Sequence, residues 1–157
     1  MLSTIASNAP TVNMAEALLR PALSRGQDND FAVICGDEFI TYGELAKTSN
    51  RASNAFRSLG VNAGDRILIM VRDTPDFFYI YLGLLKIGAI PVGLNTRLAA
   101  QDLAYIIDDS DSTLFVLDYC FTKLYHDGLE LAINTPTTVY TDEEVDGALN
   151  FETMLLA

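Results

Sequence analysis

Positive charge and histidine are both scarce in this sequence, and each shortage excludes a class of function. Ten lysines and arginines stand against 21 acidic residues among 157, which gives a formal net charge of −11. Nucleic-acid binding depends on clustered lysine and arginine, and the basic residues here form no stripe, so no nucleic-acid partner is expected. The single histidine, His126, belongs to no metal-ligand or nucleophile motif. It is predicted to be a surface residue.

Cysteine is nearly absent as well. Cys35 and Cys120 lie far apart in the sequence, each within an apolar run. A disulfide between them remains an alternative, but two small buried thiols are the favoured interpretation. No basic segment precedes a hydrophobic stretch at the N-terminus. No secretory signal is therefore predicted, and a cytoplasmic location is expected.

Motifs for phosphate and metal binding are also missing. The ten glycines form neither G-x-G-x-x-G nor G-x-x-x-x-G-K-S/T, so no mononucleotide-binding loop is predicted. Two acidic groups could offer oxygen ligands to a divalent cation, but neither follows the EF-hand pattern, and solvated side chains are the favoured interpretation. These groups are Asp108, Asp109 and Asp111, and Asp142, Glu143, Glu144 and Asp146.

Residues 77–98, FFYIYLGLLKIGAIPVGLNTRL, contain almost no charged side chains, which raises the question of a membrane span. A spanning helix needs about 20 predominantly apolar residues. Here Lys86 falls near the middle, and any helix must end before Pro91. We therefore expect no membrane partner. The stretch is predicted to divide into a helix over residues 76–87, a turn at Gly88 and a short strand, all within one globular domain.

The region before this stretch predicts a hairpin that leads into a helix. Two apolar runs, residues 31–35 and 38–41, flank Gly36-Asp37, a pair suited to a tight turn. The tetrapeptide Thr41-Tyr42-Gly43-Glu44 matches the capping box, and apolar residues at helical spacing continue the helix as far as Gly60.

The sequence before residue 31 predicts one helix and a tail without regular secondary structure. Residues 1–13 are expected to be a flexible tail. A helix follows, with Met14, Leu18 and Leu19 on one helical face and Pro21 near its end.

Downstream, apolar runs of strand length alternate with helical patterns. Because these runs are apolar on both faces, they indicate a mostly parallel sheet covered by helices on both sides, which is a doubly wound α/β fold. Strands are expected at residues 66–71, 90–93, 113–117 and 137–140, and helices at residues 76–87, 100–108, 121–131 and 150–157.

Arg97 is the basic residue best placed to bind a ligand. It follows the predicted strand at residues 90–93, in the loop LNTRL. Parallel sheets recruit ligands at the carboxyl ends of their strands, and a guanidinium there suits an anionic group. A surface arginine without a ligand remains the alternative.

Four segments resemble the amino-terminal region of the AMP-forming adenylating enzymes, a family that includes acyl- and aryl-CoA synthetases, luciferases and nonribosomal peptide adenylation domains. The segments are TYGEL with NRASNAF, LGVNAGDRI, LGLLKIGAIPVGLNTRL and LAYIIDDSD. They occur in the family's order over about residues 15–118. NTRL and AEALLRPAL are similar to the benzoate-CoA-ligase-like acid–CoA ligases in particular.

The resemblance implies a two-step reaction. A carboxylate attacks the α-phosphate of ATP to give acyl-AMP and pyrophosphate, and the thiol of CoA then displaces AMP. ATP, Mg²⁺ and CoA would be cofactors of the full-length enzyme. None is expected to be held by this chain alone, because the family's phosphate loop, magnesium and ribose residues and catalytic lysine lie beyond the matched region. No catalytic residue or metal ligand is therefore expected here.

One binding residue is carried over from the resemblance. Arg97 matches the arginine that lies near the nucleotide end of CoA in similar aryl-CoA ligases. Just after it, Ala99-Ala100 replaces the family's Ser/Thr-Pro, which removes a capping side chain worth about 1 kcal/mol.

Two functions remain open. In the first, residues 14–157 are a partial N-terminal α/β subdomain of an acid–CoA ligase, inactive alone, whose partners are the second half of the large domain and the C-terminal lid. In the second, the chain is a stand-alone, non-catalytic binding module. A flavodoxin-like nucleotide binder is disfavoured by the acidic loop RDTPD after Val71. Since such a piece would expose apolar surface, a homo-dimer or larger assembly is expected.

Overall fold

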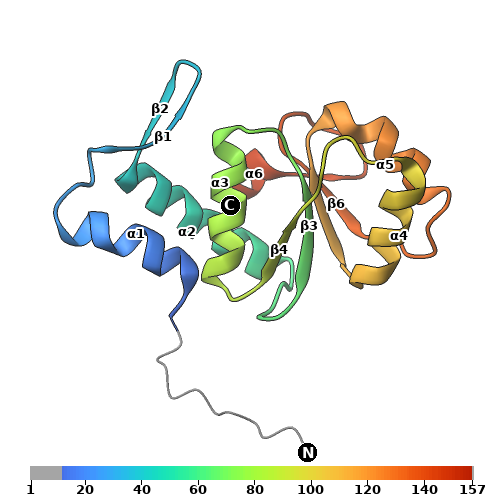
Figure 1. The fold of residues 1–157 in the computed structure, drawn as a ribbon, viewed down its shortest axis with the longest axis horizontal. Helices are drawn as coiled ribbons and strands as arrows, with labels where there is room; N and C mark the ends of the chain where they lie inside the picture. Colours follow the sequence, from blue (N-terminus) through green and yellow to red (C-terminus); the bar gives the residue numbers. More distant parts are fainter. Residues whose placement is uncertain (1–11, 157) are drawn as a thin grey trace, which may run out of the picture.

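The computed structural model describes residues 12–156. Of the predicted tail, residues 1–11 lie outside this range. A five-stranded parallel sheet stands between two layers of helices, and a two-stranded hairpin projects from one end of the molecule (Figure 1). The predicted doubly wound α/β fold with an N-terminal hairpin is confirmed.

The central sheet has the strand order β4-β3-β5-β6-β7, with every neighbouring pair parallel. The last strand is only two residues long and was not predicted, since the sequence pattern assigned its second residue to a helix. The strands are β3 (Arg66–Met70), β4 (Ile90–Gly93), β5 (Leu114–Leu117), β6 (Thr137–Tyr140) and β7 (Leu149–Asn150).

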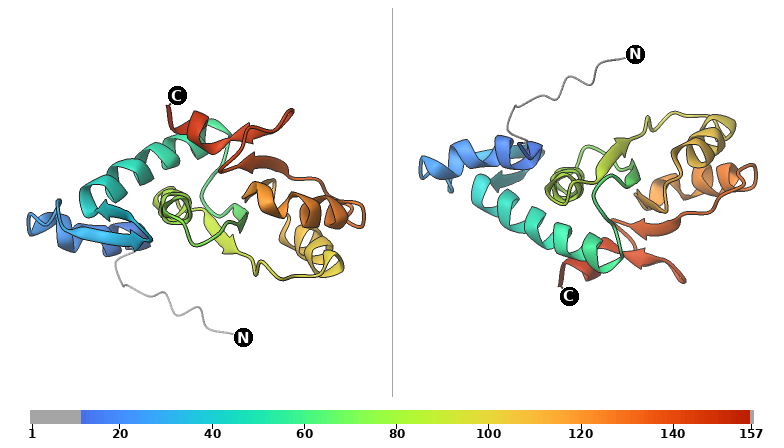
Figure 2. Two further views of the ribbon diagram at one scale, coloured as in Figure 1. Left: turned by 90° about the horizontal axis from the view of Figure 1, so that it is seen from above. Right: turned by 90° about the horizontal axis from the view of Figure 1, so that it is seen from below.

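The helices cover the sheet on both faces (Figure 2). Helices α2, α3 and α6 lie on one face, and α4 and α5 lie on the other. The helices are α1 (Met14–Ser24), α2 (Tyr42–Ser58), α3 (Pro75–Lys86), α4 (Ala100–Ser110), α5 (Thr122–Leu129) and α6 (Phe151–Leu156), and a 3₁₀ turn at Tyr119–Phe121 precedes α5.

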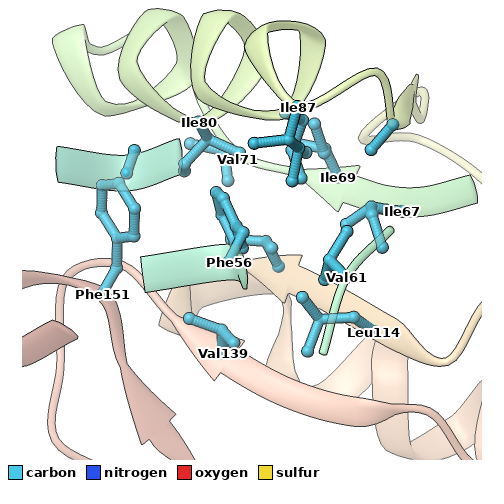
Figure 3. Close-up of a cluster of buried hydrophobic side chains, with 14 residues drawn as sticks. Phe56, Val61, Ile67, Ile69, Val71, Ile80, Ile87, Leu114, Val139 and Phe151 are labelled. Carbon is cyan, nitrogen blue, oxygen red and sulfur yellow. The ribbon is translucent and has the colours of Figure 1, made fainter. Parts of the chain in front are cut away.

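The buried strands are apolar on both sides because each side meets a helical layer. On β3, Ile67 and Ile69 pack toward α2 and α3 (Figure 3). The alternate residues Leu68 and Met70 pack toward α4 and α5. All four are at most 1% exposed. Each such side chain contributes roughly 1.5–3 kcal/mol when fully buried.

The uncharged stretch at residues 77–98 divides as predicted. Helix α3 ends at Lys86, Gly88 turns the chain at φ +80°, and β4 follows. The helix is buried between α2 and the sheet, with Ile80 and Leu84 fully covered. Within residues 12–156, no helix combines the length and the apolar character that crossing a membrane requires.

Helices α2 and α3 approach each other very closely at a glycine. A methyl group placed on Gly83 would lie 2.7 Å from the Cβ of Ala52. The hydroxyl of Ser53 donates to the carbonyl of Gly83 at 3.0 Å. The small residues are therefore what allows the two helices to pack backbone against backbone.

The hairpin and its following helix form as predicted. Strands β1 (Phe31–Cys35) and β2 (Glu38–Thr41) are antiparallel, and Gly36 in the turn has φ +59°. The capping box is confirmed: the backbone N–H of Glu44 donates to the hydroxyl of Thr41 at 3.2 Å, and the backbone N–H of Thr41 donates to the carboxylate of Glu44 at 2.9 Å.

The buried face of α1 differs from the apolar face that its sequence shows. On α1, Leu19 is buried together with the small residues Ala15 and Ala22, whereas Met14 and Leu18 are 59% and 58% exposed. The buried face of α1 contains two alanines because the helix packs closely on its neighbours. A pattern based on hydrophobicity alone would select the larger side chains for that face.

The expectation of two buried thiols is wrong. Both are free, but Cys35 is only partly buried and Cys120 is exposed. Cys120 falls in the 3₁₀ turn after β5, where the chain has already left the sheet.

Candidate functional site at the carboxyl edge of the sheet

The carboxyl ends of β3 and β5 form the topological switch point of the sheet. The chain leaves β3 for α3 on one face and leaves β5 for α5 on the opposite face. Adjacent parallel strands whose connections diverge in this way open a crevice at their carboxyl ends, and open α/β sheets bind their ligands there. The residues that occupy this crevice therefore decide what the chain can bind.

A buried carboxylate occupies the crevice. Asp118 follows β5 directly and is 2% exposed. One of its oxygens accepts the backbone N–H and the Nε–H of Arg72, at 2.9 and 2.7 Å. The other oxygen accepts the hydroxyl of Thr141, which follows β6. Burial of a charge requires such compensation, and this aspartate has it.

Arg72 continues the network to a third strand end. Its Nη2 donates to the carboxylate of Asp142 at 2.8 Å, and that carboxylate also accepts the backbone N–H of Tyr119 at 2.7 Å. Hydrogen bonding and the negative charge of Asp118 raise the pKa of the Arg72 guanidinium. The ends of β3, β5 and β6 are thus connected through one guanidinium.

This arrangement is suited to holding strand ends together and is a poor phosphate site. The guanidinium at the crevice is already paired with two carboxylates. The loop that follows adds Asp73, and the first turn of α3 adds Asp76. Burial raises the pKa of Asp76 to about 6, with further contributions from the nearby acidic residues. The residues at this edge therefore do not fit the triphosphate of ATP. Across residues 12–156, no group of three or more histidine, cysteine and acidic side chains could hold a metal ion.

The structure places Arg97 apart from this network. It lies in the loop after β4, the edge strand on the far side of β3 from β5. Its side chain is exposed, and its backbone N–H donates to the side chain of Asn95 at 2.9 Å. The next helix begins with Ala99 as N-cap and has no capping side-chain bond, as the departure from the family pattern predicts. Arg97 thus lies in a turn and is exposed to solvent.

The two acidic groups have structural partners that the sequence did not indicate. The carboxylate of Asp108 accepts the backbone N–H groups of Ile133 and Asn134, at 3.0 and 2.8 Å. These bonds lower the pKa of Asp108. Asp142 belongs to the Arg72 network, so neither residue is merely solvated. His126 is exposed, as predicted.

Sequence analysis did not single out Arg72 and Asp118. Asp118 directly follows β5, and Arg72 lies two residues after the end of β3, so both stand at the carboxyl end of a buried apolar strand. That position is the signal that could have identified them, because carboxyl ends of adjacent parallel strands meet at one edge of the sheet. What the sequence does not reveal is that β3 and β5, which are separated by β4 along the chain, are neighbours.

Comparison with known proteins gives a consistent answer. A family described as "AMP-binding enzyme" matches residues 21–153. The chain is 41% identical over 115 residues to a 3-hydroxybenzoate–CoA/4-hydroxybenzoate–CoA ligase of Thauera aromatica, a match that covers 73% of this chain and 22% of the relative. It is 39% identical over 116 residues to a 3-hydroxybenzoate–CoA ligase of an Aromatoleum species, covering 74% and 22%. The chain thus spans about a fifth of the length of these curated relatives.

Solved structures agree with the sequence comparison. A benzoate CoA ligase from Burkholderia xenovorans superposes with a TM-score of 0.81 at 28% identity, over 94% of this chain and 29% of that one. An anthranilate CoA ligase in complex with anthranoyl-AMP superposes with a TM-score of 0.83 at 24% identity, over 90% and 27%, which supports the fold. The chain belongs to the AMP-binding enzyme family and corresponds to its N-terminal region.

Proposed function

We propose that this chain is the N-terminal α/β subdomain, residues 14–157, of an AMP-forming acid–CoA ligase that acts on an aromatic carboxylic acid in the cytoplasm. The observation that carries the proposal is the match at 41% identity to a hydroxybenzoate–CoA ligase, which runs through most of the described fold. In the complete enzyme, the carboxylate, ATP and Mg²⁺ would give acyl-AMP and pyrophosphate, and CoA would then displace AMP.

In this proposal the chain supplies a scaffold, and the remainder of the enzyme handles ATP. The closed, acidic switch point supports this division, because the Arg72 guanidinium is paired with Asp118 and Asp142 and is not free for a phosphate. The network instead holds three strand ends in place. The second half of the large domain and the C-terminal lid are the proposed partners.

The first test is the activity of the 157-residue chain alone. We expect no pyrophosphate exchange above background with ATP, Mg²⁺ and 3- or 4-hydroxybenzoate, because the chain offers no phosphate-binding loop. The complete enzyme is the positive control. Exchange by the pure chain would contradict the scaffold role. A stop codon directly after Ala157 in the native gene would favour the alternative, a stand-alone binding module.

We further propose that Arg97 binds the nucleotide end of CoA in the complete enzyme. Its exposed guanidinium in the loop after β4 supports this, since arginine binds phosphate with charge-assisted hydrogen bonds. Replacing Arg97 with alanine should raise KM for CoA about tenfold, equivalent to roughly 1.4 kcal/mol, while pyrophosphate exchange stays unchanged. Arg25→Ala, in the turn after α1, is the matched control. An unchanged KM for CoA would refute the assignment.

A further inference from the structure

Strand β1 has a free side that carries no charge. Within residues 12–156 its only strand partner is β2. Its sequence is FAVIC, without the lysine or proline that natural proteins use to protect an exposed edge. A two-stranded hairpin is marginally stable by itself in water. The free edge of β1 can therefore form backbone hydrogen bonds with a third strand.

A groove runs along this free side. One wall is formed by residues 32–35 of β1, and the other is formed by Asp73 in the loop before α3 and by Phe77 and Phe78 in the helix. Its volume is about 400 Å³. No residue of β2 lines it, so the groove lies beside β1, between a strand edge and a helix. A groove of this kind can accept an extended peptide, with main-chain hydrogen bonds to the strand and side chains against the helix.

The outer surface of the hairpin is apolar as well. Phe31, Ile34 and Phe39 are 59%, 63% and 52% exposed, and the rings of Phe31 and Phe39 lie 5.2 Å apart. The hairpin projects from the body of the molecule, so the described fold leaves this surface uncovered (Figure 1). Apolar side chains gathered on a projecting element usually mark a contact surface.

The charged groups around the groove are acidic. Asp73 lines it, Glu38 pairs with Cys35 across the hairpin, and Asp76 lies in the first turn of α3. Strand β1 has no basic residue that could meet these carboxylates in a symmetric pairing, and a second copy would bring another net charge of −11. The groove therefore fits an uncharged strand flanked by lysine or arginine.

We propose that an extended segment of the remainder of the same enzyme adds to β1 as a third strand and fills this groove. The inference rests on the proposed function. The matched residues span 22% of the length of a hydroxybenzoate–CoA ligase relative, so most of such a polypeptide lies outside the match and is available to cover the hairpin. The added strand places apolar side chains against Phe77 and Phe78 and a basic side chain beside Asp73.

Amide hydrogen exchange tests the inference. Those amides of residues 32–35 that point away from β2 should exchange at least about tenfold more slowly in the complete enzyme than in the 157-residue chain, because a third strand protects the free edge. Equal exchange rates in the two proteins would overturn the inference. Protection that rises with the concentration of the 157-residue chain would assign the groove to a second copy, and would also overturn it.

A charged substitution supplies the second measurement. Ile34→Lys in the complete enzyme should abolish the protection of residues 32–35, whereas the hairpin itself should tolerate an exposed lysine. Ile133→Lys, at an 89% exposed position outside the hairpin, is the control and should leave the protection intact. AMP formation by the unsubstituted complete enzyme is measured in parallel. An active enzyme with an unprotected β1 would refute the inference while the proposed function stands.

Discussion

Asp76 is a residue whose ionisation works against the fold. It lies in the first turn of α3 and is partly buried. Burial raises its pKa to about 6, with further contributions from Glu152, Asp118, Glu38 and Asp142. An unfolded aspartate titrates near 3.9, so the folded chain holds the proton more tightly than the unfolded chain. The stabilisation from the protonated form is present below about pH 4 and is lost as the pH rises through about 6.

Removing this charge should therefore stabilise the protein at neutral pH. We expect Asp76→Asn to raise the free energy of unfolding at pH 7 by about 1 kcal/mol, a value already reduced for solvent screening. Urea denaturation between about pH 4 and 7 is the measurement, and the variant should lose less stability across this window than the parent chain.

The control is a matching position on another helix. Asp102 lies in the first turn of α4 and is exposed, so Asp102→Asn should bring no gain and should lose a few tenths of a kcal/mol of helix-dipole stabilisation. Identical pH profiles for Asp76→Asn and the parent chain would contradict the assignment.

At the scale of elements, helices α2 and α3 approach most closely at Gly83. Among the glycines of the chain, this is the one where an added methyl group would come nearest to a neighbouring atom. Gly83→Ala gains up to about 1 kcal/mol of helix propensity. The new methyl would meet the Cβ of Ala52 at 2.7 Å and the backbone nitrogen of Ser53 at 3.2 Å. Overpacking of this kind costs typically 1–3 kcal/mol. We expect a net loss of about 1–2 kcal/mol, measured by chemical denaturation.

A second glycine on a neighbouring element serves as the comparison. Gly93 ends β4, and a methyl group there meets nothing within 4 Å. Gly93→Ala should change the free energy of unfolding by at most about 0.5 kcal/mol. If both substitutions stabilised the protein equally, the close approach of α2 and α3 would not be limiting.

At the scale of the whole molecule, apolar exposure and net charge act in opposite directions. Exposed apolar side chains occur on the hairpin, on α6 at Leu156 and in the loop after α5 at Ile133. They favour association. The formal net charge of −11 opposes it through repulsion that salt screens.

We therefore expect the 157-residue chain to form a dimer or larger assembly, and the assembly to strengthen with ionic strength. Sedimentation velocity over a range of concentrations, at about 0.05 and 0.5 M salt, measures both effects, because the Debye length shortens severalfold across that range. A monomer at every concentration and both salt levels would contradict the expectation.

Local sequence patterns predicted much of this fold because the interactions behind them are local. The hairpin over residues 31–41 follows from its Gly36-Asp37 turn, and the start of α2 follows from the Thr41–Glu44 capping box. The central strands follow from apolar runs that must be covered on both faces. The buried face of α1 does not follow from its apolar pattern, since it depends on how closely a partner helix can approach Ala15 and Ala22.

The candidate site could be predicted only in part. Sequence placed Arg97 after a strand at the carboxyl edge, and the structure agrees on that location. The Arg72 network joins residues 46 and 70 positions apart. No local pattern records such a contact, because the order of strands in a sheet is set by long-range packing.

By itself, the sequence determined the elements and their amphipathic faces, since period, turn residues and caps act within a few positions of one another. The tertiary structure alone decided that β3 lies beside β5, that Asp118 is buried under Arg72, and that β1 keeps an open edge along a groove. The physical reason is that each of these features depends on which surfaces meet in space, and that choice is made by the packing of the whole chain.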